Sequence, residues 1–91
     1  EQMTAEQKIL LRENLLKQLA EARPFGVLAA RLCVGARMWN FNLAEDEIEA
    51  ELNILARKGL VEAKADAMAI ESALHWKITA AGLKTLDERG Y

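Results

Sequence analysis

Residues 52–61 read LNILARKGLV and residues 76–83 read WKITAAGL, and the fold follows from these two stretches. Leu52 and Leu55 have helical spacing, and Gly59 is the residue type that most often ends a helix in the left-handed conformation. Thr79 is a favoured N-cap residue. We therefore predict a helix ended by glycine, a strand over residues 60–65, a polar hairpin, a strand over residues 73–78 and a final helix from Thr79.

The hairpin and the last helix show weaker patterns. Residues 66–72 contain no tight Asn-Gly or Asp-Gly turn, so we expect an extended or partly irregular hairpin there. In the last helix, Leu83 and Leu86 have the spacing of an inward face.

The first predicted helix runs from about Thr4 to Ala22. Thr4 and Gln7 have the spacing of a capping box, in which each side chain binds a free backbone N–H at the helix start. A wide apolar stripe follows at helical spacing: Ile9, Leu10, Leu11, Leu15, Leu16, Leu19 and Ala22. Such a stripe has two interpretations, packing within the domain alone or a homodimer seam along this helix.

A short apolar helix is predicted over residues 25–33, because Pro24 ends the preceding segment. Its expected buried side chains are Val27, Leu28, Leu32 and Val34. Gly35 is expected to break the helix, which leaves a connection over residues 36–41 that is longer than a tight helix-turn-helix turn. Trp39 and Phe41 in this connection either fill the gap between two helices or form an exposed aromatic contact beside Arg37.

The third predicted helix covers residues 42–58, with Asn42 as N-cap and Glu45 in its first turn. Ile48, Leu52 and Leu55 define its inward face. Steps of about 100° per residue then place a second group on the outward face: Asp46, Glu49, Ala50, Asn53 and Arg57, with Glu47 at the margin. The outward face therefore begins with acids.

Length and composition limit the possibilities. Ninety-one residues with 52% hydrophobic content predict a single domain over residues 1–91 with its own core. No apolar run approaches the roughly 18 residues that a membrane span needs, and the N-terminal residues lack the pattern of a signal peptide. Cys33 has no cysteine partner, and we expect it to be a small buried residue. These features suit a reducing cytoplasm.

Charge is unevenly spread along the chain, whose formal net charge is -2. Residues 1–44 contain six lysines or arginines and four acids, whereas residues 45–91 contain six and ten. Nucleic-acid-binding domains usually present a basic face, because phosphate neutralisation supplies most of their non-specific affinity. The chain as a whole is therefore unfavourable for nucleic acid, but residues 22–44 contain three arginines and no acid and predict a local basic patch.

Catalysis is not predicted. The chain has one histidine and one cysteine on different elements and no glycine-rich phosphate loop, so no nucleophile and base, metal-ligand set or cofactor motif is indicated. The carboxylates of residues 45–51 form a charge run at a helix start rather than a buried pair with separated pKa values.

This order of three helices, a two-stranded β wing and a closing helix resembles the winged helix-turn-helix superfamily, in particular small bacterial regulators of the multiple-antibiotic-resistance and phenolic-acid types. The chain also resembles small winged-helix proteins of Mu-like phages in its length and in its closing threonine-glycine helix. The resemblance implies an α+β, mostly α, fold. The residues that carry it are Leu52, Leu55, Gly59, Leu60, Val61, Trp76, Ile78, Thr79, Gly82 and Leu83.

The resemblance implies that the third helix enters the major groove of double-stranded DNA, as in a transcriptional regulator, with a phage or prophage origin as one option. Arginines before the helix and basic residues of the wing would then contact phosphates. The predicted DNA-binding residues are Arg31, Arg37, Asn53, Arg57, Lys64, His75 and Lys77. The alternative is a protein-interaction module that presents the acids Asp46, Glu47 and Glu49 to a basic partner, without DNA binding.

Overall fold

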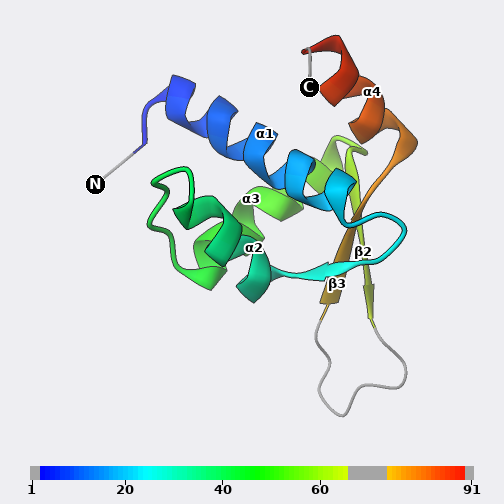
Figure 1. The fold of residues 1–91 in the computed structure, drawn as a ribbon, viewed down its shortest axis with the longest axis horizontal. Coiled ribbons are helices and arrows are strands. Elements are labelled where there is room, and N and C mark those ends of the chain that lie inside the picture. Colours follow the sequence, from blue (N-terminus) through cyan, green and yellow to red (C-terminus); the bar gives the residue numbers. More distant parts are fainter. Residues whose placement is uncertain (1–2, 66–73, 90–91) are drawn as a thin grey trace.

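The computed structural model describes residues 3–65 and 74–89 of the chain. These residues form a mostly helical α+β fold in the predicted order of elements (Figure 1). The helices and strands are α1 (Ala5–Glu21), β1 (Val27–Leu28), α2 (Ala29–Arg37), α3 (Glu45–Arg57), β2 (Val61–Ala65), β3 (Leu74–Ile78) and α4 (Ala80–Glu88). The predicted hairpin over residues 66–72 lies outside the described residues.

Helix α1 begins at the predicted capping box. The Gln7 backbone N–H donates to Thr4 Oγ1 at 3.1 Å, and the Thr4 N–H donates to Gln7 Oε1 at 2.9 Å. Both bonds satisfy backbone donors that have no partner within the helix.

The second helix differs from the prediction. Residues 25–28 are not helical; Val27 and Leu28 instead pair with Trp76 and His75 of β3 as strand β1. Helix α2 begins at Ala29 and continues through Gly35, so Leu28 and Val34 are exposed although both were predicted to be buried. The free edge of β3 decides this outcome, because it offers hydrogen bonds that residues 27 and 28 do not have locally.

The prediction that Gly35 breaks α2 is wrong because of contacts with α1. A Cβ atom at Gly35 would lie 1.9 Å from Gln18 Oε1, so the missing side chain lets the two helices approach closely. The Gln18 amide donates to the Leu32 carbonyl at 3.1 Å and to Asn14 Oδ1 at 2.8 Å. Asn14 is only 2% exposed, and this polar group therefore joins α1 to α2 inside the structure.

Helix α3 begins later than predicted, and its N-cap is Ala44 rather than Asn42. The Ala44 backbone N–H donates to Glu47 Oε1 at 3.0 Å, and the Glu47 N–H donates to Asp46 Oδ1 at 3.0 Å. Acidic side chains within the helix thus take the role that was assigned to Asn42. The predicted inward face is confirmed, since Ile48, Leu52 and Leu55 are almost completely buried.

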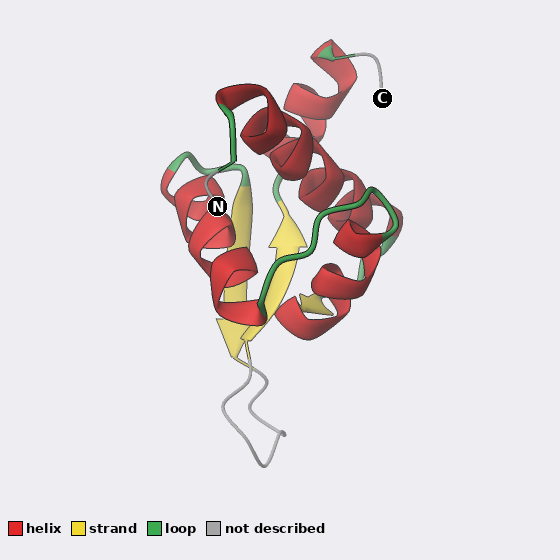
Figure 2. Cartoon of the chain, turned by 90° about the vertical axis from the view of Figure 1, so that its left-hand side faces the viewer, coloured by secondary structure: helices red, strands yellow, loops and turns green. Residues whose placement is uncertain are grey.

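The three strands form one antiparallel sheet in the order β1, β3, β2. The predicted two-stranded hairpin is confirmed in β2 and β3, and β1 adds a third strand that the sequence did not reveal. Trp76 lies at the centre of β3, opposite Val27 on one side and Ala63 on the other. Figure 2 shows the strands, in yellow, running between helices that lie on either side of them in that view.

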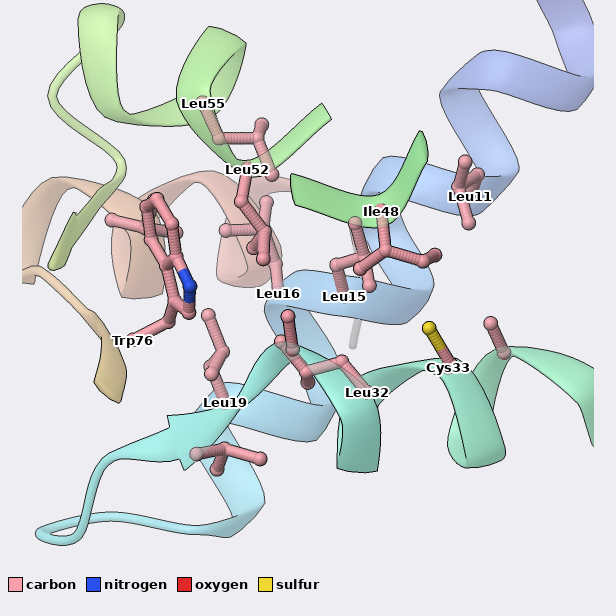
Figure 3. Close-up of a cluster of buried hydrophobic side chains, with 14 of the residues drawn as sticks. Leu11, Leu15, Leu16, Leu19, Leu32, Cys33, Ile48, Leu52, Leu55 and Trp76 are labelled. Atoms are coloured by element: carbon pink, nitrogen blue, oxygen red, sulfur yellow. The ribbon is translucent and has the colours of Figure 1, made fainter. Parts of the chain in front are cut away.

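The core forms where α1, α2, α3 and β3 meet. Leucines of α1 and α2 pack against Ile48 and Leu52 of α3, and the Trp76 indole, 2% exposed, closes the cluster on the sheet side (Figure 3). The fully buried large side chains are Leu11, Leu15, Leu19, Leu32, Ile48, Leu52 and Leu55. Leu86 of α4 is buried as predicted, whereas Leu83 is only partly buried.

Gly59 and Thr79 join α3, the sheet and α4. Gly59 ends α3 with φ of 76°, as predicted. The Thr79 hydroxyl donates to the Gly59 carbonyl at 2.6 Å and accepts from the Gly82 N–H at 3.1 Å, while the Thr79 N–H donates to the Leu60 carbonyl at 3.0 Å. A Cβ atom at Gly82 would lie 2.2 Å from the Leu60 carbonyl oxygen, so this contact requires glycine.

Two glycine-to-alanine substitutions should have different costs. The Cβ atom of Gly59→Ala would meet nothing within 4 Å. The only cost is the strain of an alanine in the left-handed conformation, which should lower the free energy of unfolding by about 1 to 2 kcal/mol. Gly82→Ala forces a methyl group against backbone and Ile78, so we expect an overpacking cost of about 3 kcal/mol or more. Urea unfolding of both variants measures the difference. Ala81→Gly, at the exposed neighbour, is the control. Equal losses for Gly59→Ala and Gly82→Ala would contradict the close contact.

Candidate nucleic-acid interface

Helix α3 presents the outward face that helical periodicity predicts. Asp46, Glu49, Asn53 and Arg57 are all exposed, as is Ala50 between them. Asn53 and Arg57 lie one turn apart on the second half of this face, and their side chains suit adenine and guanine edges respectively. The first half of the face is acidic.

Part of this acidity has a local structural role. Asp46 and Glu47 accept backbone N–H groups at the start of α3, where the helix dipole also favours negative charge. Glu51 points back to α1 and accepts from Arg12 Nε at 2.9 Å. Glu45 and Glu49 are both exposed. The predicted partner-binding set of Asp46, Glu47 and Glu49 therefore combines capping residues with a surface carboxylate.

Cys33 lies on the side of α2 that faces α3. The thiol is buried, and this burial is the main reason that its pKa is raised. Glu45 and Glu49 also raise the pKa of Cys33, whereas Arg37 lowers it. Arg37 follows Cys33 by four residues in α2, which is the spacing of neighbours on one helix face.

The predicted basic patch of residues 22–44 is not a single cluster. Arg31 lines two hollows together with Gln18 and Glu21 of α1, whereas Arg37 acts on the side that faces α3. Six residues of helix separate them by about 9 Å along the axis and roughly 120° in direction. Arg31 and Arg37 therefore project from different sides of α2, and Arg31 shares its hollow with Trp39.

Trp39 lies in the connection between α2 and α3, with 36% of its surface exposed. The Lys17 ammonium group of α1 lies 5.8 Å from the centre of the indole ring. Phe41 is only partly buried and packs against the core. Both sequence interpretations thus hold in part, because Phe41 fills the gap between the helices while Trp39 keeps an exposed side.

The basic residues of the hairpin share one face of the sheet. Lys64 pairs with His75 and Glu62 pairs with Lys77 across β2 and β3, so all four side chains lie on the face opposite Trp76. Glu62 is a site residue that the sequence interpretation missed. It lies between Lys64 and Lys77, which are both predicted to contact phosphates. Its Oε1 atom forms an ion pair with Lys64 Nζ at 3.7 Å. Side chains two residues apart on a strand lie on the same face, so the position of Glu62 two residues before Lys64 is the signal that could have identified it.

Within residues 3–65 and 74–89, no helix combines the length and apolar character that crossing a membrane requires. The same described residues contain no group of three or more histidine, cysteine or acidic side chains placed to hold a metal ion.

Solved structures with the same architecture are found, although no family model and no curated protein matches the chain. A protein named as a transcriptional regulator, TA0346 of Thermoplasma acidophilum, superposes with a TM-score of 0.84 at 18% identity, over 96% of this chain and 82% of its own. The chain has the winged helix-turn-helix fold. In this fold α2 and α3 form the helix-turn-helix and β2 and β3 form the wing.

Two further winged-helix structures are longer than this chain. The MarR family transcription regulator SP03579 matches with a TM-score of 0.69 and 18% identity, over 86% of this chain and 46% of its own. A MepR mutant of S. aureus bound to an oligodeoxyribonucleotide matches with a TM-score of 0.73 and 18% identity, over 91% and 60%. The chain thus spans about half the length of these two proteins.

Proposed function

We propose that this protein acts by binding double-stranded DNA, as a winged-helix transcriptional regulator, rather than by catalysis. The observation that supports the proposal best is the position of α3. It is the second helix of the helix-turn-helix, its outward face is fully exposed, and it ends in Asn53 and Arg57. A protein of the same fold, MepR, has been solved with an oligodeoxyribonucleotide.

The charges favour contact through the second half of α3 and the wing. Asn53 and Arg57 are separated from the acidic first turn by about two helical turns. Lys64, His75 and Lys77 share the outward face of the wing, where only Glu62 opposes them among the described strand residues. Arg37, Glu45 and Glu49 all act on the Cys33 thiol, and we infer that Arg37 would reduce the repulsion between phosphates and these two carboxylates.

A homodimer is the assembly that fits this function, because two-fold symmetric operators match two-fold symmetric proteins. Ile9 and Leu10 are 42% and 46% exposed on α1, whereas four leucines of the same stripe are buried: Leu11, Leu15, Leu16 and Leu19. Leu10 also borders a hollow with Met3, Phe41 and Leu43. We infer that this end of α1 forms the seam.

A second function is supported by one observation, the exposed carboxylates Glu45 and Glu49 in the recognition position. In that case α3 presents its acidic end to a basic protein segment, and the fold serves protein recognition without DNA. The two functions make opposite predictions for a charge reversal on α3.

DNA binding should show a steep dependence on salt. We expect the affinity for random duplex DNA to fall linearly on a log–log plot, with a slope of about -0.9 for each phosphate contact. Arg57→Ala should reduce that slope or weaken binding roughly tenfold, as expected for a lost phosphate or base contact. Arg23→Ala is the matched control, because Arg23 borders α4 instead of α3. Fluorescence anisotropy measures both, and an absence of binding at about 20 mM salt would overturn the proposal.

Charge reversal at Glu49 distinguishes the two functions. Glu49→Lys should strengthen DNA binding roughly tenfold at about 0.1 M salt, because it removes a repulsion and adds a phosphate contact. Glu88→Lys on α4 makes the same change in net charge away from the interface and should have a much smaller effect. If α3 binds a basic protein instead, Glu49→Lys should weaken capture of a lysine-rich helical peptide and leave DNA affinity equal to that of the control.

The seam on α1 can be tested by sedimentation equilibrium. The unmodified chain should dimerise, and Leu10→Glu combined with Ile9→Glu should weaken association at least about tenfold, since it places charge in an apolar contact. Phe25→Glu is the control, because Phe25 is equally apolar, 74% exposed and outside α1. A monomeric unmodified chain at about 0.1 mM would rule out a functional dimer through this face.

A further inference from the structure

Helix α2 has an apolar outward side, in contrast to most surface helices. Val34 of α2 is 58% exposed, and Met38, the C-cap residue one turn later, is 82% exposed. Trp39 follows directly after Met38 and is itself part exposed. Large apolar side chains gathered on one surface mark interaction sites more often than isolated ones do.

These side chains border a hollow between α1 and α2 with a volume of about 440 Å³. Its floor is Gly35, where the absence of a side chain lets Gln18 lie flat across the two helices. Gln18 is held by hydrogen bonds to Asn14 and to the Leu32 carbonyl. In this hollow, which we call the groove, the Gln18 side chain is therefore already ordered before a ligand binds.

The charges around the groove are mostly positive. Arg31 borders one end, one turn before Val34, and Lys17 borders the other side beside Trp39. Helix α2 contains no acid, and Glu21 of α1 is the one acid among the residues that line the groove. An occupant with apolar side chains flanked by carboxylates would therefore match both the surface and its field.

We propose that the groove between α1 and α2 docks an acidic amphipathic helix of a partner protein. The apolar face of that helix packs on Val34, Met38 and Trp39, and its carboxylates lie against Arg31 and Lys17. Methionine suits such a surface, because its flexible thioether adapts to different apolar side chains. This surface is separate from the outward face of α3, so the proposal stands whether or not the protein binds DNA.

The test uses a synthetic helix of about 18 residues, roughly five turns, with leucines on one face and glutamates on the flanks. A twin peptide replaces every glutamate with lysine and keeps the leucines. The peptide is added to the isotope-labelled full chain, and NMR shifts are followed at the Val34 and Met38 methyl groups and the Trp39 indole N–H. We expect saturable shifts at these positions with the acidic peptide and at least about tenfold weaker binding of the lysine twin.

Two pairs of variants locate the contact. Met38→Gln and Arg31→Glu should each weaken the binding of the acidic peptide about fivefold to tenfold. The first removes apolar contact, and the second reverses a charge at the rim of the groove. Phe25→Gln and Arg23→Glu make the same changes at exposed positions outside the groove and should leave binding unchanged. All four residues are exposed, and thermal unfolding of each variant verifies that the fold is retained.

Three results would overturn the proposal. Equal binding of both peptides would show a non-specific apolar contact, and an absence of shifts up to about 1 mM peptide would show no docking site. Shifts of the same resonances with chain concentration alone, without peptide, would assign the groove to a second copy of this chain.

Discussion

Thr79 donates its hydroxyl to the carbonyl of Gly59 and its backbone N–H to the carbonyl of Leu60. Four elements meet at these two bonds, because α3 ends two residues before Gly59, β2 starts after Leu60, β3 ends before Thr79 and α4 begins after it. Gly82 lies so close to the Leu60 carbonyl that a side chain would not fit. The angle between α3 and the hairpin is set here, and every proposed contact on α3 or the wing depends on that angle.

The acidic run at the start of α3 serves the fold and the surface at once. Asp46 and Glu47 satisfy backbone donors that would otherwise need water, and Glu51 holds α3 to Arg12 of α1. These carboxylates would be useful to α3 in a protein of any function. The negative charge that they leave on the outward face is therefore weak evidence against DNA binding. Glu49 takes part in none of these contacts, so a substitution there tests the function of the surface.

Features decided by neighbours three or four residues apart were predictable from the sequence. The capping box of Thr4 and Gln7, the end of α3 at Gly59 and the inward face of α3 are examples. Features decided by distant partners were not. Strand β1 exists because β3 offers an edge, and α2 continues through Gly35 because Gln18 packs against it. Arg31 and Arg37 are six residues apart in α2, and this helical spacing decides the different directions in which they project.

Strand β1 is two residues long, yet it bonds the wing to the helix-turn-helix. Leu28 pairs with His75 of the wing, and the next residue, Ala29, begins α2. A ligand that tilts β3 would therefore displace the first turn of α2, where Arg31 borders the groove. Thermodynamic linkage makes such an influence mutual, so an occupant of the groove would change the affinity of the wing by the same factor. An occupant of the groove and a ligand of the wing would then influence each other through a single pair of residues.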